Sequence, residues 1–465
     1  MASVYIGDSK SRVAIFGDIM LDHTIEGSSS KIANEAPVPV IQFEKEKYSI
    51  GGCGNVVLNV GALGAENIYL FSRIGTDTHG QIIQSVLPSN IINHMIRDPE
   101  FTTITKHRIY CERKLMCRYD NERIYPINVI QEQNILERFQ GLLETTPPSS
   151  VIFSDYNKGF LTKSLCQGII GMCNKYGIPT IVDPKIDYRK YIGCTVIKPN
   201  KSETRNIFNI DLNTTNTESA HSQIQSIMNC SASVLTLSGD GISARKDNHT
   251  YHITEDTKDV IDVTGAGDVV CSVLGTYYPF ISDFELLIRI ANHLASISVS
   301  HLGVYTITNT DLINTHKFIH KTKQIKLEHL PHVGTKKVVF TNGCFDILHS
   351  AHLEVFKYCR QLGDIVIVGL NSDASIKRLK GDTRPINCLE ERIKMLSAIE
   401  TIDFIIPFDE DTPLNLIKTI KPDYLVKGGD YSPETIVGRE YALNTVVFNY
   451  IEGLSTTNTI QKIRK

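Results

Sequence analysis

Residues 262–268, with the sequence DVTGAGD, combine two glycines and a carboxylate directly before an apolar run. The apolar run predicts a helix, and the free N–H groups and dipole at a helix start form an anion site. Gly265, Ala266 and Gly267 allow a tight turn and close approach of the backbone to a ligand. Asp268 would therefore stand beside a site that suits a phosphate group. A purely structural turn is the less favoured interpretation, because the whole pattern is more specific than an isolated Gly-x-Gly-Asp.

His349 and His352 form a second candidate site at the predicted start of another helix, after the apolar strand Val338–Phe340. Residues three positions apart share one face of a helix. Two imidazoles beside a helix N-terminus are suited to hold phosphate oxygens during attack at phosphorus. Capping or core histidines are the structural alternative. A zinc site is a third interpretation, although no further ligand stands at a suitable spacing.

Asn200 and Glu203 enclose Lys201 and Ser202 at the start of a further predicted helix. Their side-chain oxygens could hold Mg²⁺ and its phosphate, directly or through water. The same spacing is also that of a capping box, which is the structural alternative.

The elements that must position these groups follow a strand–helix alternation. Short apolar strands are predicted at residues 13–16, 151–154, 181–182, 196–198 and 234–237, and each ends in polar residues. This pattern predicts an α/β fold with a doubly wound sheet, whose ligands collect at the carboxyl ends of the strands. Residues 38–48 and 103–119 read as exposed strands of a small β lid. Basic residues in the second of these segments, among them Arg108, belong to a solvated face or meet an anionic substrate group.

Three segments are expected along the chain: a first domain at 1–315, a linker at 316–336 and a Rossmann-like second domain at 337–465. The length of 465 residues agrees with more than one domain. The formal net charge of −3 gives no reason to expect nucleic acid as a partner. The 11 cysteines include no C-x-x-C pair, which favours a reducing compartment. With no signal peptide pattern and no apolar run of about 20 residues, we expect a cytoplasmic protein without a membrane partner.

The first half resembles the ribokinase (PfkB) family of carbohydrate kinases, through Gly51-Gly52-x-x-Asn55 and residues 262–268. The resemblance implies a ribokinase-like fold, ATP and Mg²⁺ as cofactors, and Asp268 as the catalytic base beside the Gly265–Gly267 anion hole. It implies that ATP contacts Asn200, Lys201, Ser202, Glu203, Ser238, Gly241 and Asn292, and that Glu203 serves Mg²⁺ directly or through water. It places the sugar near Asp18, Gly52, Asn55, Arg108, Asp155, Lys158, Asp183 and Lys185.

The second half resembles the cytidylyltransferase-type nucleotidyltransferases, whose mark is His-x-Gly-His. The resemblance implies that the nucleotide contacts Phe345, His349, His352, Lys380, Lys427, Gly428, Asp430, Ser455, Thr456 and Thr457. One departure stands out, because Ala351 replaces the glycine between the histidines. Its Cβ takes space where a nucleotide packs, and alanine disfavours positive φ.

The order of the two halves is similar to a family of bifunctional enzymes of ADP-heptose synthesis. That resemblance implies ATP-dependent phosphorylation of D-glycero-β-D-manno-heptose 7-phosphate at O1. It also implies adenylyl transfer from ATP to heptose 1-phosphate, which gives ADP-heptose and pyrophosphate for lipopolysaccharide core biosynthesis, and a homodimer. One alternative is an active kinase whose transferase is impaired by Ala351. Others are the use of another sugar phosphate or of CTP, and a nucleotide- or sugar-phosphate-binding sensor without turnover.

Overall fold

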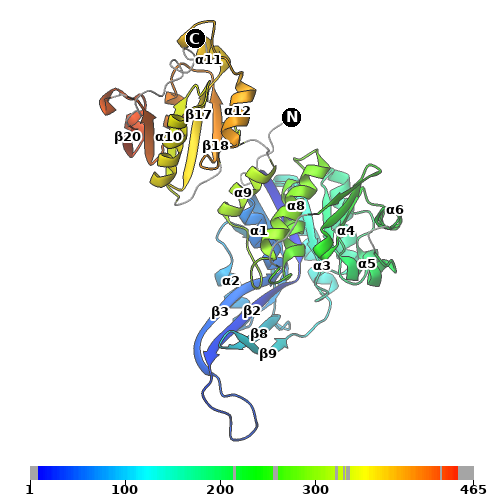
Figure 1. The fold of residues 1–465 in the computed structure, drawn as a ribbon. Coiled ribbons are helices and arrows are strands. Elements are labelled where there is room, and N and C mark those ends of the chain that lie inside the picture. The colour runs from blue at the N-terminus through cyan, green and yellow to red at the C-terminus, as the bar shows by residue number, and fades with distance from the viewer. Residues whose placement is uncertain are drawn as a thin grey trace. The chain divides into compact units, whose positions relative to one another are not determined.

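The computed structural model describes residues 9–212, 216–254, 260–319, 323–327, 330, 336–429 and 432–448. The chain forms two compact units, which divide between Leu312 and Ile313 (Figure 1). Each unit is built around its own sheet of mostly or entirely parallel strands.

A nine-stranded sheet forms the centre of the first unit. Its spatial order is β15-β14-β13-β12-β11-β10-β1-β4-β6, parallel except for β14 and β15. The strands are β1 (Ser9–Gly17), β4 (Ala65–Phe71), β6 (Ile91–Asn93), β10 (Ser150–Ser154), β11 (Thr180–Asp183), β12 (Val196–Ile197), β13 (Ala232–Thr236), β14 (Ile242–Lys246) and β15 (His249–Ile253). The central strands are apolar and buried on both faces, as parallel strands between two helix layers must be.

Helices cover both faces of this sheet. One face packs against α3 (Val129–Thr145), α4 (Lys163–Tyr176) and α6 (Thr217–Met228), around a core that includes Phe16, Phe139 and Phe153. The strands also contact α1 (Cys53–Ala62), α7 (Ala266–Tyr277) and α8 (Phe284–Ser298). A Cβ at Gly275 of α7 would lie 2.2 Å from Cδ1 of Ile152, so glycine allows α7 to approach β10 closely. The remaining helices are α2 (Thr78–Val86) and α5 (Lys201–Phe208).

A four-stranded sheet projects from the α/β body of the first unit (Figure 1). Its order is β3-β2-β8-β9, with β2 (Ile19–Ser28), β3 (Gln42–Gly52), β8 (Thr105–Cys111) and β9 (Lys114–Asn121). Two short strands, β5 (Arg73–Gly75) and β7 (Ile96–Asp98), pair separately. The projecting sheet contains the two segments that the sequence predicts as exposed strands, and we call it the lid.

The second unit contains a five-stranded parallel sheet of order β18-β17-β16-β19-β20. Its strands are β16 (Val338–Gly343), β17 (Ile365–Asn371), β18 (Phe404–Phe408), β19 (Tyr424–Gly428) and β20 (Asn444–Phe448), and its helices are α10 (Ser350–Leu362), α11 (Asp373–Lys380), α12 (Leu389–Ser397) and α13 (Leu414–Ile420). Side chains alternate across the sheet, so that Val339 packs with Cys359 of α10 and Phe340 with Ile417 of α13. This is the Rossmann-like arrangement that the alternation predicts.

The segment between the units includes α9 (Asn309–Ile319) and part of the predicted linker at 316–336. Gln324 forms a parallel bridge with Ile405, and Ile325 is buried in the core of the second sheet. Burial of the apolar Ile325 side chain in this core is more favourable than its exposure to water in a linker would be. We therefore propose that the second domain begins upstream of residue 337.

Candidate active sites

Asp268 occupies the first turn of α7, after Gly265 caps that helix in the left-handed conformation with φ of 86°. Its side chain is buried and accepts two hydrogen bonds. Nδ2 of Asn55 donates to one carboxylate oxygen at 2.7 Å, and the Tyr156 hydroxyl donates to the other at 2.8 Å. Burial raises the pKa of Asp268, and the two hydrogen bonds oppose that rise. The carboxylate is therefore held in one orientation at a helix N-terminus.

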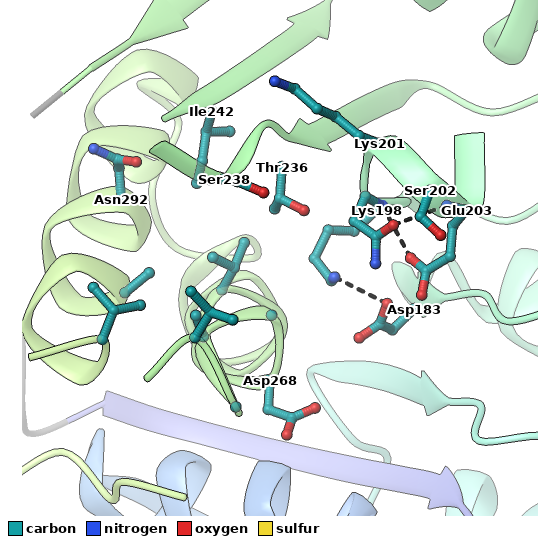
Figure 2. Close-up of a pocket in the computed structure, with 18 of the residues that line it drawn as sticks. Asp183, Lys198, Lys201, Ser202, Glu203, Thr236, Ser238, Ile242, Asp268 and Asn292 are labelled. Carbon is teal, nitrogen blue, oxygen red and sulfur yellow. Dashed lines mark hydrogen bonds and ion pairs between the residues drawn. The ribbon is translucent and has the colours of Figure 1, made fainter. Parts of the chain in front are cut away.

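A pocket of about 510 Å³ adjoins Asp268 at the carboxyl ends of the central strands (Figure 2). Most of the residues predicted for the first site line it: Asp155, Asp183, Lys185, Asn200, Lys201, Ser202, Glu203, Ser238, Gly241, Gly265, Ala266, Gly267, Asp268 and Asn292. The lining does not include Asp18, Gly52, Asn55, Arg108 or Lys158. The pocket thus unites the predicted ATP residues with the predicted base, as expected for the carboxyl edge of a parallel sheet.

Asn200 and Glu203 form the complete capping box of α5. The Glu203 N–H donates to Oδ1 of Asn200 at 2.8 Å, and the Asn200 N–H donates to Oε2 of Glu203 at 2.9 Å. The other oxygen of Glu203 accepts from Lys185 at 3.1 Å. The capping-box interpretation of Asn200 and Glu203 is therefore confirmed. The same two side chains also line the pocket.

Mg²⁺ fits the chemistry of this pocket. Asp183, Asn200 and Glu203 supply carboxylate and amide oxygens, which are the donors that Mg²⁺ prefers. Over the described part of the chain, no group of three or more His, Cys, Asp or Glu side chains forms a ready metal site. Mg²⁺ in ATP-dependent transferases generally keeps several waters and is bound mainly through substrate phosphates.

Lys198 also lines the pocket, although no sequence motif predicts a role for it. Its Nζ lies 2.9 Å from Oδ1 of Asp183 (Figure 2), and a Cβ on Gly267 would lie 3.3 Å from the same Nζ. The ammonium therefore lies against the glycine turn before Asp268. Although burial opposes the charged form, Asp183 and Glu203 raise the pKa of Lys198, so the ammonium remains charged.

Asp18 and Asp155 form hydrogen bonds that hold the loop after β10. Asp18 accepts the backbone N–H groups of Tyr156, Lys158 and Phe160 at 3.0–3.1 Å. Asp155 accepts from the Tyr191 hydroxyl at 2.7 Å. These bonds occupy the carboxylates and favour a role in placing Tyr156 against Asp268.

Gly52 is required by the backbone beside Asp18. It has a φ of 60°, and a Cβ there would lie 2.3 Å from the carbonyl oxygen of Asp18. Arg108 of the lid binds Asp22 at 2.5 Å, and Lys158 of the loop after β10 binds Glu122 at 2.6 Å. The predicted sugar contacts of Gly52, Arg108 and Lys158 stay predictions.

His349 and His352 lie at the start of α10 with their rings stacked, 3.8 Å between centroids. The His349 N–H donates to Nδ1 of His352 at 3.4 Å, so a neutral His352 carries its proton on Nε2. Burial, with smaller effects from His349 and Lys380, lowers the pKa of His352 to about 4. Burial also lowers the pKa of His349. Both imidazoles are therefore neutral near pH 7.

A second pocket of about 510 Å³ contains this histidine pair. Its lining includes the predicted residues Phe345, His349, His352, Lys380, Lys427 and Gly428. Asp430, Ser455, Thr456 and Thr457, also predicted to contact the nucleotide, lie outside the described residues. Three further residues line this pocket without having been predicted as nucleotide contacts. Asn342 accepts a hydrogen bond from Lys427 through Oδ1 at 3.0 Å, and Thr412 and Val437 come from loops without a recognisable motif.

Ala351 is a helical residue in the first turn of α10 and lines the second pocket. It is not among the residues with positive φ, so alanine costs nothing in backbone strain at this position. The expected conflict between a Cβ and a left-handed conformation is therefore absent. The methyl group only takes up space in the pocket wall.

Comparisons with known proteins identify the family of each half. The pfkB family of carbohydrate kinases matches residues 10–311, and the cytidylyltransferase-like family matches residues 340–456. The bifunctional protein HldE of Sulfurimonas denitrificans is 38% identical over 468 residues, covering 97% of both chains. That of Campylobacter concisus is 40% identical over 465 residues, again with 97% of both chains covered. The chain belongs to the HldE family of bifunctional proteins.

Solved structures support the fold of the kinase half in this HldE family member. Phosphofructokinase-2 from Escherichia coli, in complex with potassium, matches with a TM-score of 0.54 at 15% identity, covering 66% of this chain and 99% of that chain. Ribokinase from Thermotoga maritima matches with a TM-score of 0.51 at 14% identity and the same coverages. The ribokinase-like fold followed by a Rossmann-like nucleotidyltransferase domain is thus confirmed.

The predicted enzyme class is confirmed as well, since both halves of the HldE family member match transferase families. The chain combines a carbohydrate kinase with a nucleotidyltransferase-like domain. No helix within the described ranges is both long and apolar enough to span a membrane.

Proposed function

We propose that the protein catalyses two steps of ADP-heptose synthesis. The kinase half phosphorylates O1 of D-glycero-β-D-manno-heptose 7-phosphate with ATP, and the second half transfers AMP from ATP to heptose 1-phosphate. The observation that carries the proposal is the pair of pockets, one around Asp268 and one around His349 and His352, in a member of the HldE family. A sensor without turnover would have no need of a buried, oriented carboxylate at a helix start.

In the kinase half, Asp268 accepts the proton of the attacking sugar hydroxyl. Asn55 and Tyr156 hold the carboxylate in position, so little reorganisation is needed during the reaction. The Gly265–Gly267 turn and the first N–H groups of α7 bind the phosphoryl group as it moves. Asn200 and Glu203 would hold Mg²⁺ directly or through water, and the ion would supply positive charge to the phosphates of ATP. Phosphoryl transfer then depends mainly on positioning and on charge stabilisation.

In the second half, a phosphate oxygen of heptose 1-phosphate attacks the α-phosphorus of ATP. A new P–O bond forms, the bond between the α-phosphorus and the bridging oxygen breaks, and pyrophosphate leaves. The neutral His352 presents its Nε2–H to the phosphate oxygens on which charge develops, and His349 stacks against it. The transition state is thus stabilised by donors that the helix start already holds in place.

The substrates can be tested directly with the purified full-length protein. With heptose 7-phosphate and Mg·ATP we expect ADP and the 1,7-bisphosphate, and with heptose 1-phosphate we expect ADP-heptose and pyrophosphate. Replacement of ATP by CTP in the second reaction is expected to lower turnover strongly. No product from either heptose phosphate, with turnover on another sugar phosphate, would contradict the proposed substrates. We further propose that the protein is cytoplasmic and forms a homodimer. Sedimentation equilibrium tests the dimer.

Ala351→Gly is expected to change the rate of pyrophosphate release less than about threefold. The reason is that Ala351 already has a helical backbone conformation, so glycine relieves no strain. Glycine instead destabilises the helix by about 1 kcal/mol. The measurement is kcat and KM for heptose 1-phosphate beside the wild type. A silent wild type with an active glycine variant would instead support the impaired-transferase alternative.

Lys198→Met is expected to lower kinase turnover about 10²–10³-fold, the usual effect of removing one preorganised donor to developing charge. Lys198 lies against the Gly267 turn, where the transferring phosphoryl group is proposed to bind. Steady-state kinetics should show the loss mainly in kcat, with a smaller change in the KM for ATP. Adenylyl transfer by the same preparation is the internal control, because the second pocket is built from residues of the other unit. An equal loss of both activities would contradict a specific role for Lys198.

A further inference from the structure

The strands β8 and β9 of the lid and the loop after β10 carry, among other cations, Lys106, Arg108, Arg118 and Lys158. Three of them have a carboxylate partner. Arg108 binds Asp22 at 2.5 Å and Lys158 binds Glu122 at 2.6 Å. Arg118 binds Asp120 through two hydrogen bonds of 2.9 and 2.7 Å. Their charges are already neutralised by the protein.

Lys106 differs from these three cations. No hydrogen bond or ion pair joins its ammonium to another described residue, although the side chain is half-buried. Burial is the main reason why the pKa of Lys106 is lowered, and the attraction of Asp22 only opposes it. A partly buried ammonium without a hydrogen-bonded partner is costly for a folded protein. The lid therefore holds an ammonium that no hydrogen bond or ion pair joins to a carboxylate of the described chain.

The ammonium of Lys106 lies near the catalytic carboxylate. Its Nζ is 6.0 Å from the centre of the Tyr156 ring, and the Tyr156 hydroxyl donates to Asp268. On β8, Lys106 is also the register partner of Asp22 on β2. A sugar whose hydroxyl meets Asp268 would therefore extend past Tyr156 toward the lid, with its far end close to Lys106.

We infer that Lys106 binds the phosphate group of the sugar phosphate acceptor and makes the kinase select a phosphorylated sugar. The inference rests on the proposed function. It names Lys106, and not Arg108, as the residue that meets the substrate's anionic group, because the Arg108 guanidinium is bound to Asp22. The ammonium contributes charge and up to three hydrogen bonds to phosphate oxygens. Unphosphorylated heptose lacks that group and gains nothing from Lys106.

The test compares heptose 7-phosphate with unphosphorylated heptose in the wild type, in Lys106→Met and in Arg118→Met. A hydrogen-bonded ion pair of this kind is worth about 10–100-fold in binding. We therefore expect Lys106→Met to raise the KM for heptose 7-phosphate by about that factor, with kcat/KM for unphosphorylated heptose changed less than about threefold. Arg118→Met is the matched control, because that cation already has its partner, and its preference for the phosphorylated sugar should stay at the wild-type level.

Each outcome has a separate meaning. Equal losses on both sugars in Lys106→Met would show a structural role and overturn the inference, as would an unchanged KM for heptose 7-phosphate. Lys106→Arg, which keeps the charge, should restore part of the preference for the phosphorylated sugar. Wild-type protein that phosphorylates neither heptose would overturn the proposed function itself, and the inference with it.

Discussion

Asp268→Asn is expected to lower phosphorylation of heptose 7-phosphate about 10²–10⁴-fold, the range that a positioned general base contributes. Asparagine keeps the shape of the side chain and can still meet Asn55 and Tyr156, but it cannot accept the hydroxyl proton. The measurement is ADP formation under saturating substrates. Adenylyl transfer by the same preparation is the internal control, because its site belongs to the other unit, and it should remain at the wild-type rate. Near-normal phosphorylation in a folded variant would contradict the assignment of the base.

The same variant also tests the electrostatics of the first pocket. Burial raises the pKa of Asp268 in the folded protein, so the folded state binds this proton more tightly than the unfolded chain does. The stability contributed by protonated Asp268 is therefore present at low pH and is lost as the pH rises through the folded-state pKa. The asparagine side chain carries no charge, so Asp268→Asn should unfold at a higher temperature than the wild type at pH 7. This difference should shrink as the pH falls, and a lower Tm for the variant at pH 7 would contradict the burial argument.

The sequence predicts well the parts of the fold that depend on local pattern. Apolar runs give the central strands, and the glycine turn before Asp268 gives the start of α7. Lys198 was missed because a cation after a two-residue strand has no local signature. Only the pairing of β11 with β12 brings it beside Asp183.

The predicted sugar-binding residues also have contacts that local sequence patterns do not reveal. Asp18 stands at the end of β1, where ligands collect, and its residue type suits a sugar hydroxyl. Its carboxylate accepts hydrogen bonds from backbone N–H groups 138–142 positions away, which no local pattern reveals, and its contact with a sugar hydroxyl stays a prediction. Likewise Arg108 and Lys106 cannot be distinguished by sequence. Only the fold shows that Arg108 is ion-paired with Asp22, whereas Lys106 has no ion pair with any residue that the structure describes.

His352→Ala is expected to lower adenylyl transfer about 10²–10³-fold while phosphorylation of heptose 7-phosphate is unchanged. The variant removes the Nε2–H donor, and the kinase pocket is built from residues of the other unit. Pyrophosphate release from heptose 1-phosphate and Mg·ATP measures the loss. A rate within about threefold of the wild type would contradict a role for this imidazole in the transition state.

The pH profile of the wild type distinguishes how His352 acts. Its folded-state pKa is lowered to about 4 by burial, so the imidazole is neutral from about pH 5.5 to 8 and its protonation does not change across that range. If the neutral imidazole is a fixed hydrogen-bond donor, it does not titrate in that range. The wild type and His352→Ala should then show the same pH steps in kcat for adenylyl transfer. A step near the ordinary histidine pKa of about 6.5 that His352→Ala removes would mean that the bound nucleotide restores an ordinary pKa. The histidine would then act as a cation that pairs with the phosphates, and Lys380, which opposes its protonation in the free protein, would have to move toward the nucleotide.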